Sequence, residues 1–149
     1  MKYLIPLLLA GMLHCQDSIE LYGFGVSYHS DRTKDYNEWN RGLGVGWTHF
    51  IEPDFEASFR QDFTLIAGRY LDSYREPARF LMPGVRFTWG SMESWHAWWG
   101  INAGYYVGSD WHGVGAMPSG GISYDRVGLG MTAAPGMVAW YGKFEVARW

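Results

Sequence analysis

The segment WHAWWGINAGYYV, which runs from Trp95 to Val107, decides the fold. Side chains of a β-strand point alternately to opposite faces, so residues of one parity share a face. One parity of this segment is continuously apolar and comprises Trp95, Ala97, Trp99, Ile101, Ala103, Tyr105 and Val107. The other parity is mainly small or polar and comprises His96, Trp98, Gly100, Asn102, Gly104 and Tyr106. The segment therefore predicts a strand with one continuous apolar face.

The segment from Arg79 to Trp89 divides in the same way, with Gly84, Arg86 and Thr88 on its less apolar side. A soluble β-sandwich also alternates, so the pattern alone leaves both folds open. Three features favour a membrane barrel: an export signal, aromatic residues near segment ends, and Gly, Asn and Arg on the non-apolar faces. These match the aromatic girdles and polar lumen of outer-membrane barrels.

Residues 1–18 have the features of a secretory signal peptide. Lys2 supplies a positive charge, and Tyr3 to Leu13 form an apolar core. This core is too short for a membrane helix, which needs roughly 20 apolar residues. Cys15 leaves open a lipid-modified N-terminus, whereas cleavage after Cys15 would leave a chain with no cysteine and no possible disulfide.

The chain has 149 residues, which suits one domain, and residues 19–149 are predicted to form it. A net charge of −3 offers no basic surface for nucleic acid, and an aromatic content of 18% excludes disorder. The fold class we predict is all-β, an eight-stranded antiparallel up-and-down transmembrane β-barrel. Its predicted strands are 19–29, 41–50, 63–71, 79–89, 95–107, 118–124, 127–133 and 137–149. The stretch 51–62 is expected to be a turn, with a strand extension as the alternative.

Alternate connections of an up-and-down barrel fall on the same rim, and this rim faces outward if both termini face the periplasm. The connections that share it hold His29 to Asn40, Asp72 to Glu76, Ser109 to His112, and Pro135-Gly136. His29, Asp72 and Ser73 can therefore converge although they are distant in sequence. Adjacent strand residues point to opposite faces, so Asp72 and Ser73 can serve one site only where the strand ends or bends.

Two other motifs have simpler explanations than ligand binding. Gly42, Gly44 and Gly46 resemble a phosphate loop only superficially, because no P-loop lysine or following helix is present, and close packing inside a narrow barrel is expected. Asp110 and His112 have no third ligand nearby, so no metal site is expected. No G-x-S-x-G nucleophile elbow occurs.

At the rim residues the sequence resembles the lipid A palmitoyltransferase (PagP) family. The resemblance covers most of residues 19–149 in four short blocks, and their order and spacing together are fairly specific. The blocks are Leu21-Tyr22 with Tyr28-His29; Asp35-Tyr36-Asn37-Glu38; Asp72-Ser73 with Glu76-Pro77, Gly84 and Trp89; and Asp110-Trp111 with Pro118, Tyr124 and Pro135-Gly136.

The resemblance implies a monomeric enzyme of the Gram-negative outer membrane that moves a palmitoyl chain from a phospholipid to lipid A. No cofactor is implied. The family's required histidine, aspartate and serine correspond to His29, Asp72 and Ser73. A glycine that sets the depth of the acyl-chain pocket corresponds to Gly84, and a proline beside a gap through which lipid enters corresponds to Pro118.

His29 would be the general base, since a histidine pKa near neutrality suits that role. Asp72 would orient the ring or steady its charge, and Ser73 would be either a hydrogen-bond donor or a transient nucleophile. Tyr36, Asn37 and Glu38 are expected to order the first loop over the site and to help bind substrate. The simpler alternative is that these three residues form an ordinary turn.

Three departures from the family pattern are visible. No amphipathic helix precedes the first strand, Phe24 stands where a proline beside one of two lipid portals is expected, and 51–62 is a longer connection. Two alternative functions stay open. One is a non-enzymatic structural or adhesive barrel whose rim residues are solvated loop, and the other is a lipid A deacylase.

Overall fold

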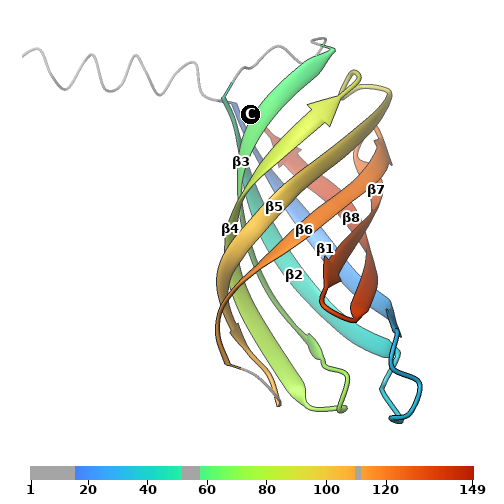
Figure 1. The fold of residues 1–149 in the computed structure, drawn as a ribbon. Helices are drawn as coiled ribbons and strands as arrows, with labels where there is room; N and C mark the ends of the chain where they lie inside the picture. The colour runs from blue at the N-terminus through green and yellow to red at the C-terminus, as the bar shows by residue number, and fades with distance from the viewer. Residues whose placement is uncertain (1–15, 52–57, 110–111) are drawn as a thin grey trace, which may run out of the picture.

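The computed structural model describes residues 16–51, 58–109 and 112–149, and these form one closed antiparallel barrel (Figure 1). Neighbouring strands along the chain pair with each other, and β1 pairs with β8 to close the barrel. The strands are β1 (Gln16–His29), β2 (Trp39–Phe50), β3 (Phe59–Leu71), β4 (Pro77–Trp89), β5 (Trp95–Val107), β6 (His112–Tyr124), β7 (Val127–Ala134) and β8 (Met137–Arg148). The predicted eight-stranded barrel is confirmed. No described segment forms a helix that is long and apolar enough to cross a bilayer.

Five strands begin earlier than the sequence predicted, β2 and β4 by two residues and β1, β3 and β6 by three or more. β1 starts at Gln16, so the last three residues assigned to the signal peptide are in the barrel, while residues 1–15 lie outside the described part of the chain. β3 starts at Phe59, which pairs with Trp89, so the strand extension that the sequence left open is confirmed from Phe59 to Gln61, and residues 52–57 lie outside the described part of the chain. β6 starts at His112, and its glycine-rich first half holds a single β-branched residue, Val114, so its local strand propensity is weak.

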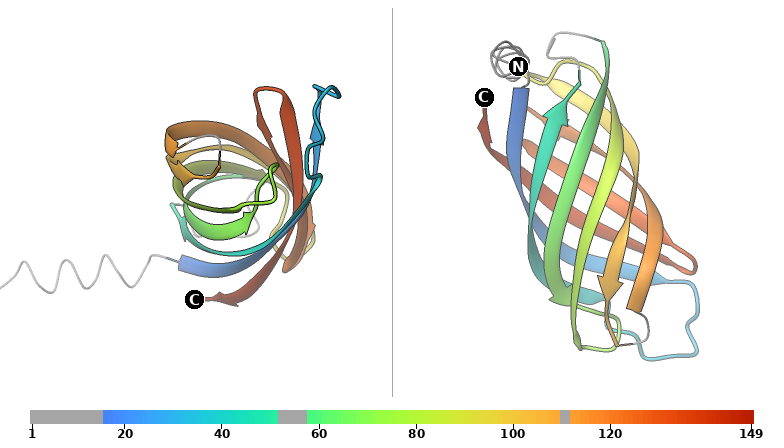
Figure 2. Two further views of the ribbon diagram at one scale, coloured as in Figure 1. Left: turned by 90° about the horizontal axis from the view of Figure 1, so that it is seen from below. Right: turned by 90° about the vertical axis from the view of Figure 1, so that its left-hand side faces the viewer.

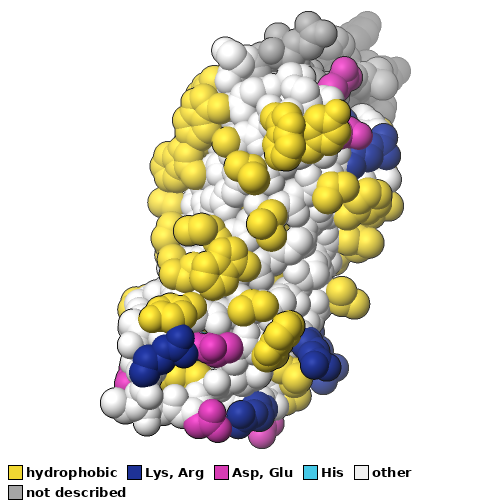
Figure 3. All heavy atoms as spheres, turned by 90° about the vertical axis from the view of Figure 1, so that its right-hand side faces the viewer, with side chains coloured by type: hydrophobic (Ala, Val, Ile, Leu, Met, Phe, Trp, Pro, Cys, Tyr) yellow, Lys and Arg dark blue, Asp and Glu magenta, His cyan; other side chains and the backbone are white. Residues whose placement is uncertain are grey.

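The wall of the barrel is apolar on its outer side, and its inner side is polar near the chain termini and apolar toward the opposite rim. Leu43 and Val114 are 76% and 77% exposed, which is typical of a lipid-facing surface and not of a soluble protein. Figure 3 shows one side of the barrel, where hydrophobic side chains cover the middle and charged side chains gather toward the ends. The predicted alternation of strand faces therefore separates lipid from lumen.

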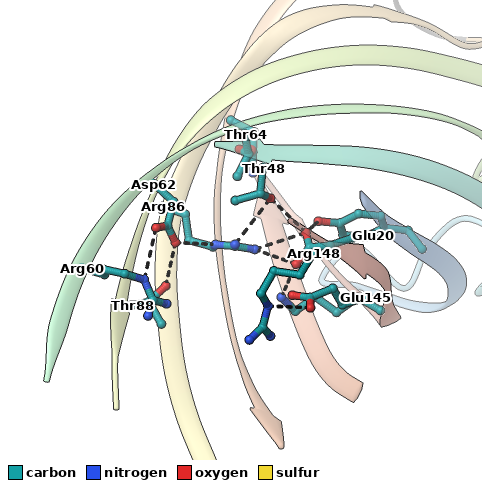
Figure 4. Close-up of polar contacts among 12 residues, drawn as sticks. Glu20, Thr48, Arg60, Asp62, Thr64, Arg86, Thr88, Glu145 and Arg148 are labelled. Atoms are coloured by element: carbon teal, nitrogen blue, oxygen red, sulfur yellow. Dashed lines mark hydrogen bonds and ion pairs between the residues drawn. The ribbon is translucent and has the colours of Figure 1, made fainter. Parts of the chain in front are cut away.

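Buried charges fill the end of the lumen near the chain termini (Figure 4). The Arg86 guanidinium contacts Glu20 at 3.0 Å and Asp62 at 3.2 Å, and Lys143 Nζ donates to Glu20 at 2.8 Å. The Tyr22 hydroxyl donates to Glu20 at 2.6 Å and caps this network. The network closes one end of the lumen with mutually paired charges.

Inward-facing glycines of β2 make room for aromatic rings above that network. A Cβ atom added to Gly46 would lie 2.7 Å from the Tyr22 ring, and one added to Gly44 would lie 3.1 Å from the Phe24 ring. Such distances are too short for any larger residue without a shift of the ring. The structure agrees with the expectation that these glycines serve close packing.

A β-bulge at Gly25 decides which residue of β1 faces the lumen at the rim. Phe24 and Val26 pair with consecutive residues of β8, so Gly25 is an extra residue. A bulge of this kind re-aims the side chains that follow it. His29 is consequently only 8% exposed, whereas its neighbour Tyr28 is 48% exposed and faces outward.

Candidate active site at the open rim

His29 and Ser73 meet at the rim opposite the charged network. His29 is the last residue of β1, and Ser73 follows the end of β3 by two residues. The Ser73 Oγ lies 2.9 Å from His29 Nε2, and the Ser27 Oγ lies 3.3 Å from the same nitrogen. A serine hydroxyl within hydrogen-bond distance of an imidazole is the basic arrangement for proton transfer from an alcohol.

Asp72 has a different role from the one predicted for it. Its Oδ1 accepts hydrogen bonds from the backbone N–H groups of Tyr74 and Glu76, and its Oδ2 accepts from the backbone N–H and the hydroxyl of Ser109. These four donors satisfy the carboxylate, and within the described residues it forms no hydrogen bond with His29. Asp72 therefore makes no orienting contact with His29 and instead joins the third and fifth connections, while its alternative role of steadying the charge of the ring stays a prediction.

The environment of Asp72 keeps its carboxyl group ionised. Burial by itself would raise the pKa of Asp72, but hydrogen bonds from Ser109, Glu76 and Tyr74 outweigh burial and lower the pKa below its usual value. The hydrogen bonds to the Asp72 carboxylate therefore stabilise the fold fully at any pH above the ordinary aspartate pKa. They are lost only as the pH falls through the lowered pKa of Asp72. The loop is thus held in place throughout the neutral range.

The first connection folds over the His29 and Ser73 pair. The Tyr36 ring stacks on the His29 ring with 4.3 Å between centroids. The Asn37 backbone N–H donates to the Ser73 carbonyl at 2.7 Å, and its side-chain amide donates to the Asp72 carbonyl at 3.0 Å. The Glu38 carbonyl accepts from Ser27, and its carboxylate pairs with Arg32. These contacts agree with the expected ordering of this loop, and they leave its role in binding substrate untested.

Hydrogen bonds link all four connections of this rim. The contacts already described join the first connection to the third and the third to the fifth. The Ser30 backbone N–H donates to the Gly136 carbonyl at 2.9 Å, which joins the first connection to the seventh. The predicted common rim is confirmed for the described residues, while Asp110 and Trp111 lie outside them.

An apolar cavity of about 490 Å³ runs from Ser73 at the rim into the barrel, and His29 is not among the residues that line it. Its mouth includes Asp72 and Ser73, and its deep end is formed by Tyr22, Met82 and Tyr141. Phe24, at the position where a proline was expected, lines the wall and packs on Phe80 with 5.5 Å between centroids. The volume falls within the range of about 300–1,000 Å³ that is usual for ligand pockets.

Gly84 lies just below this cavity and does not line it. A Cβ atom at Gly84 would lie 2.2 Å from the Asn102 Oδ1 and 2.8 Å from the Ile101 carbonyl oxygen. Asn102 itself lines the cavity. Gly84 is therefore placed one layer deeper than predicted, where it could set the depth of the cavity only through Asn102.

Pro118 lies at the point where the pairing of β6 with β7 ends. Pairing between β6 and β7 extends no further than Ser119 and Thr132, whereas pairing between β5 and β6 continues to His112. The Thr132 hydroxyl donates to the Pro118 carbonyl at 3.1 Å and closes the last paired step. Beyond it, Met117 and Pro135 from the two sides line the cavity. This placement matches a proline beside a gap in the barrel wall.

Sequence reasoning missed two residues that shape this site. Ser27 contacts His29 and lies two positions before it, so its parity in a strand was an available signal. Ser109 anchors the Asp72 carboxylate from a connection 37 positions away, and nothing in the sequence marks it. Among the described residues no group of three or more His, Cys, Asp or Glu side chains could hold a metal ion.

The closed eight-stranded sheet, apolar wall and polar lumen define the class: a small outer-membrane-type β-barrel. No family model matches the chain, and no curated protein sequence matches it either. Among solved structures it is similar to Ail, the attachment invasion locus protein of Yersinia pestis, with a TM-score of 0.50 and 8% identity over 90% of this chain and 98% of that one. A second Ail structure, in complex with the heparin analogue sucrose octasulfate, gives a TM-score of 0.51 and 9% identity over 91% and 99% of the two chains. At such identity the likeness shows the fold alone.

Proposed function

We propose that this protein is a PagP-like acyltransferase of the Gram-negative outer membrane, moving a palmitoyl-type chain from a phospholipid to lipid A. One observation carries the proposal: Ser73, which lines an apolar cavity, holds its Oγ 2.9 Å from His29 Nε2. The apolar lining of the cavity suits an acyl chain, because it resembles the hydrocarbon interior of the membrane from which the chain would come. The opening beside Pro118 would let the chain enter from the side.

In the reaction, a lipid A hydroxyl gives its proton to His29, and the hydroxyl oxygen attacks the ester carbonyl of the phospholipid. The ester bond to the glycerol oxygen breaks, and the imidazolium returns the proton to that oxygen, which leaves as a lysophospholipid. Ser73 acts either as a donor to the developing oxyanion or as a nucleophile that carries the acyl group transiently. Asp72 supports the pair by holding the third connection in place.

Two other functions fit particular observations. A non-enzymatic barrel is compatible with the fold likeness to a protein named for attachment and invasion. The serine and histidine pair would also suit a lipid A deacylase, in which an acyl ester of lipid A is the bond that breaks and water is the acceptor.

Mass spectrometry of lipid A separates the three functions. Cells that lack their own palmitoyltransferase are compared with and without the wild-type chain. A mass gain of one palmitoyl group supports transfer. Loss of an acyl chain would establish the deacylase instead, and unchanged lipid A with a correctly folded barrel would leave only the non-enzymatic function.

Replacing Gly84 tests whether the cavity measures the acyl chain. In Gly84→Met the new side chain must displace Asn102 into the cavity, so a shorter chain should be preferred. Forcing two extra CH₂ groups into a shortened cavity costs about 1–3 kcal/mol, so the preference between neighbouring even-numbered chains should change roughly tenfold. The lengths are read from lipid A mass spectra.

The control is Gly23→Met, because no atom lies within 4 Å of a Cβ atom at Gly23. That variant should keep the wild-type chain length. If a folded Gly84→Met variant transferred chains of unchanged length, Gly84 would have no part in chain selection.

A further inference from the structure

Charged residues are sorted unusually strictly between the two sides of the barrel wall. Six of those in the described strands are buried in the lumen, two are half-buried, and three are exposed. The buried ones are Glu20, Arg60, Asp62, Arg86, Lys143 and Glu145; the half-buried ones are Asp17 and Arg148; the exposed ones are Arg41, Arg69 and Arg79. Every fully exposed charge of the described strands is therefore an arginine.

The three exposed arginines form one row near the rim that carries the candidate site. They lie on β2, β3 and β4, which run side by side in the right-hand view of Figure 2. Each lies two residues from the rim end of its strand. Arg69 and Arg79 are direct cross-strand partners, and Arg41 precedes Gly42, whose partner adjoins Arg69. We call these three residues the arginine row.

The arrangement needs an anionic partner. Like charges directly opposite on neighbouring strands destabilise a sheet, and Arg69 and Arg79 are such a pair. No ion pair joins the arginine row to a carboxylate within the described residues, and the rim carboxylates of Asp35 and Glu38 pair with other arginines. Around the row the wall is apolar, with Leu43 on β2 and Leu81 on β4 highly exposed.

We propose that the arginine row docks the phosphate groups of lipid A lying against the outer wall of β2, β3 and β4. Guanidinium groups pair well with phosphate, and the neighbouring apolar wall suits acyl chains. Neighbouring strands are about 4.8 Å apart, so a row across three strands spans roughly 10 Å. This span can engage two phosphates of one glycolipid, whereas a phospholipid headgroup offers one.

The choice of lipid A as the docked lipid rests on the proposed function, in which lipid A is the acyl acceptor. Ser73 lies four residues after Arg69, and both belong to the end of β3 and its connection. A glycolipid held by its phosphates on the outer side of this hairpin would have its sugar hydroxyls close to the rim. The row would thus position the acceptor and leave the cavity free for the acyl chain.

The test compares the folded full barrel with the triple variant Arg41→Gln, Arg69→Gln, Arg79→Gln in detergent micelles. Binding of bis-phosphorylated lipid A is measured by native mass spectrometry. Each positive charge near an anionic lipid surface raises the binding affinity about fivefold. The triple variant should therefore bind on the order of 100-fold more weakly. The matched control is Arg126→Gln, an exposed arginine in the turn between β6 and β7, which should bind like wild type.

Three further measurements decide the interpretation. The triple lysine variant keeps the three positive charges, so it should retain the electrostatic part of the binding and bind more tightly than the triple glutamine variant. Lipid A stripped of its phosphates, and phosphatidylglycerol with its single phosphate, should bind wild type and the triple glutamine variant alike. Equal binding of bis-phosphorylated lipid A by wild type and the triple glutamine variant would overturn the proposal, as would an equal loss with phosphatidylglycerol.

A His29→Ala barrel separates this proposal from the proposed function. It should bind bis-phosphorylated lipid A as wild type does. If wild type transferred no acyl chain but the arginine row still bound lipid A, acyl transfer would fail and docking would stand. If wild type transferred an acyl chain but the triple glutamine variant bound lipid A normally, docking by the arginine row would fail and acyl transfer would stand.

Discussion

His29→Ala is expected to lower the rate of acyl transfer by a factor of about 10² to 10⁴, the usual contribution of a general base. The imidazole is the group that the structure places against Ser73 Oγ, and the Tyr36 ring and Ser27 hold it there. Removing it leaves the cavity and the loop contacts of Asp72 unchanged. The measurement is the transfer rate from a labelled phospholipid to lipid A with purified barrel in micelles.

The matched control is His112→Ala, which removes an exposed histidine from the start of β6 on the same rim. This variant should transfer at the wild-type rate. A His29→Ala barrel that is folded and equally active would remove the general base from the mechanism and return the non-enzymatic barrel to first place.

The pH profile provides a second check on His29. Asp72 has a lowered pKa, so its hydrogen bonds are intact above the ordinary aspartate value and do not change near neutrality. A rise in rate between about pH 5 and 8 would therefore report an imidazole that must be neutral to act as a base. Asp72→Asn should reduce the rate through disorder of the connection without moving that rise along the pH axis.

The fold could be predicted from the sequence because two-residue alternation is a local property. Trp95 to Val107 fixes the inner and outer faces of β5, and its predicted bounds match the structure. The start of β6 was missed because Gly113, Gly115 and Pro118 carry turn chemistry, while the strand there depends on pairing with β5. Tertiary pairing overrides weak local propensity in such a segment.

The site could be predicted only in part. Topology brings the connections of His29 and Ser73 to one rim, and this follows from counting strands. The orientation of the Asp72 carboxylate depends on Ser109 and on two backbone N–H groups. No sequence pattern specifies these donors. The inward direction of His29 depends on the bulge at Gly25, which shifts the parity of β1 by one residue. Parity counted from Tyr22 alone would have pointed His29 at the lipid.

The lumen has two layers with opposite polarity, and this division explains how a narrow barrel could hold an acyl chain. The deep layer is filled by paired charges, so it cannot admit apolar chain without breaking ion pairs. The upper layer is lined by rings and aliphatic groups and is open at the rim. Tyr22 joins the two, since its ring forms the cavity floor and its hydroxyl bonds to Glu20.

Arg86→Met is expected to destabilise the barrel by about 3–5 kcal/mol, the usual effect of removing one partner from a buried ion pair. Arg86 bridges Glu20 and Asp62, and all three side chains are almost fully buried. Without the guanidinium, two carboxylates share the lumen with fewer counter-charges. The free energy of unfolding is measured by denaturant titration of the barrel in lipid vesicles.

Two controls give this prediction its meaning. Arg75→Met removes an arginine whose partner Asp35 is 91% exposed, and an ion pair so accessible to water contributes little, so its unfolding curve should overlay that of wild type. The double variant Glu20→Gln, Arg86→Met removes opposite charges together and should recover part of the loss, since the leftover buried carboxylate is what makes the single variant costly. Equal stability of Arg86→Met and wild type would mean that water enters the deep layer and screens its charges, and the closed floor of the acyl cavity would then have to be abandoned.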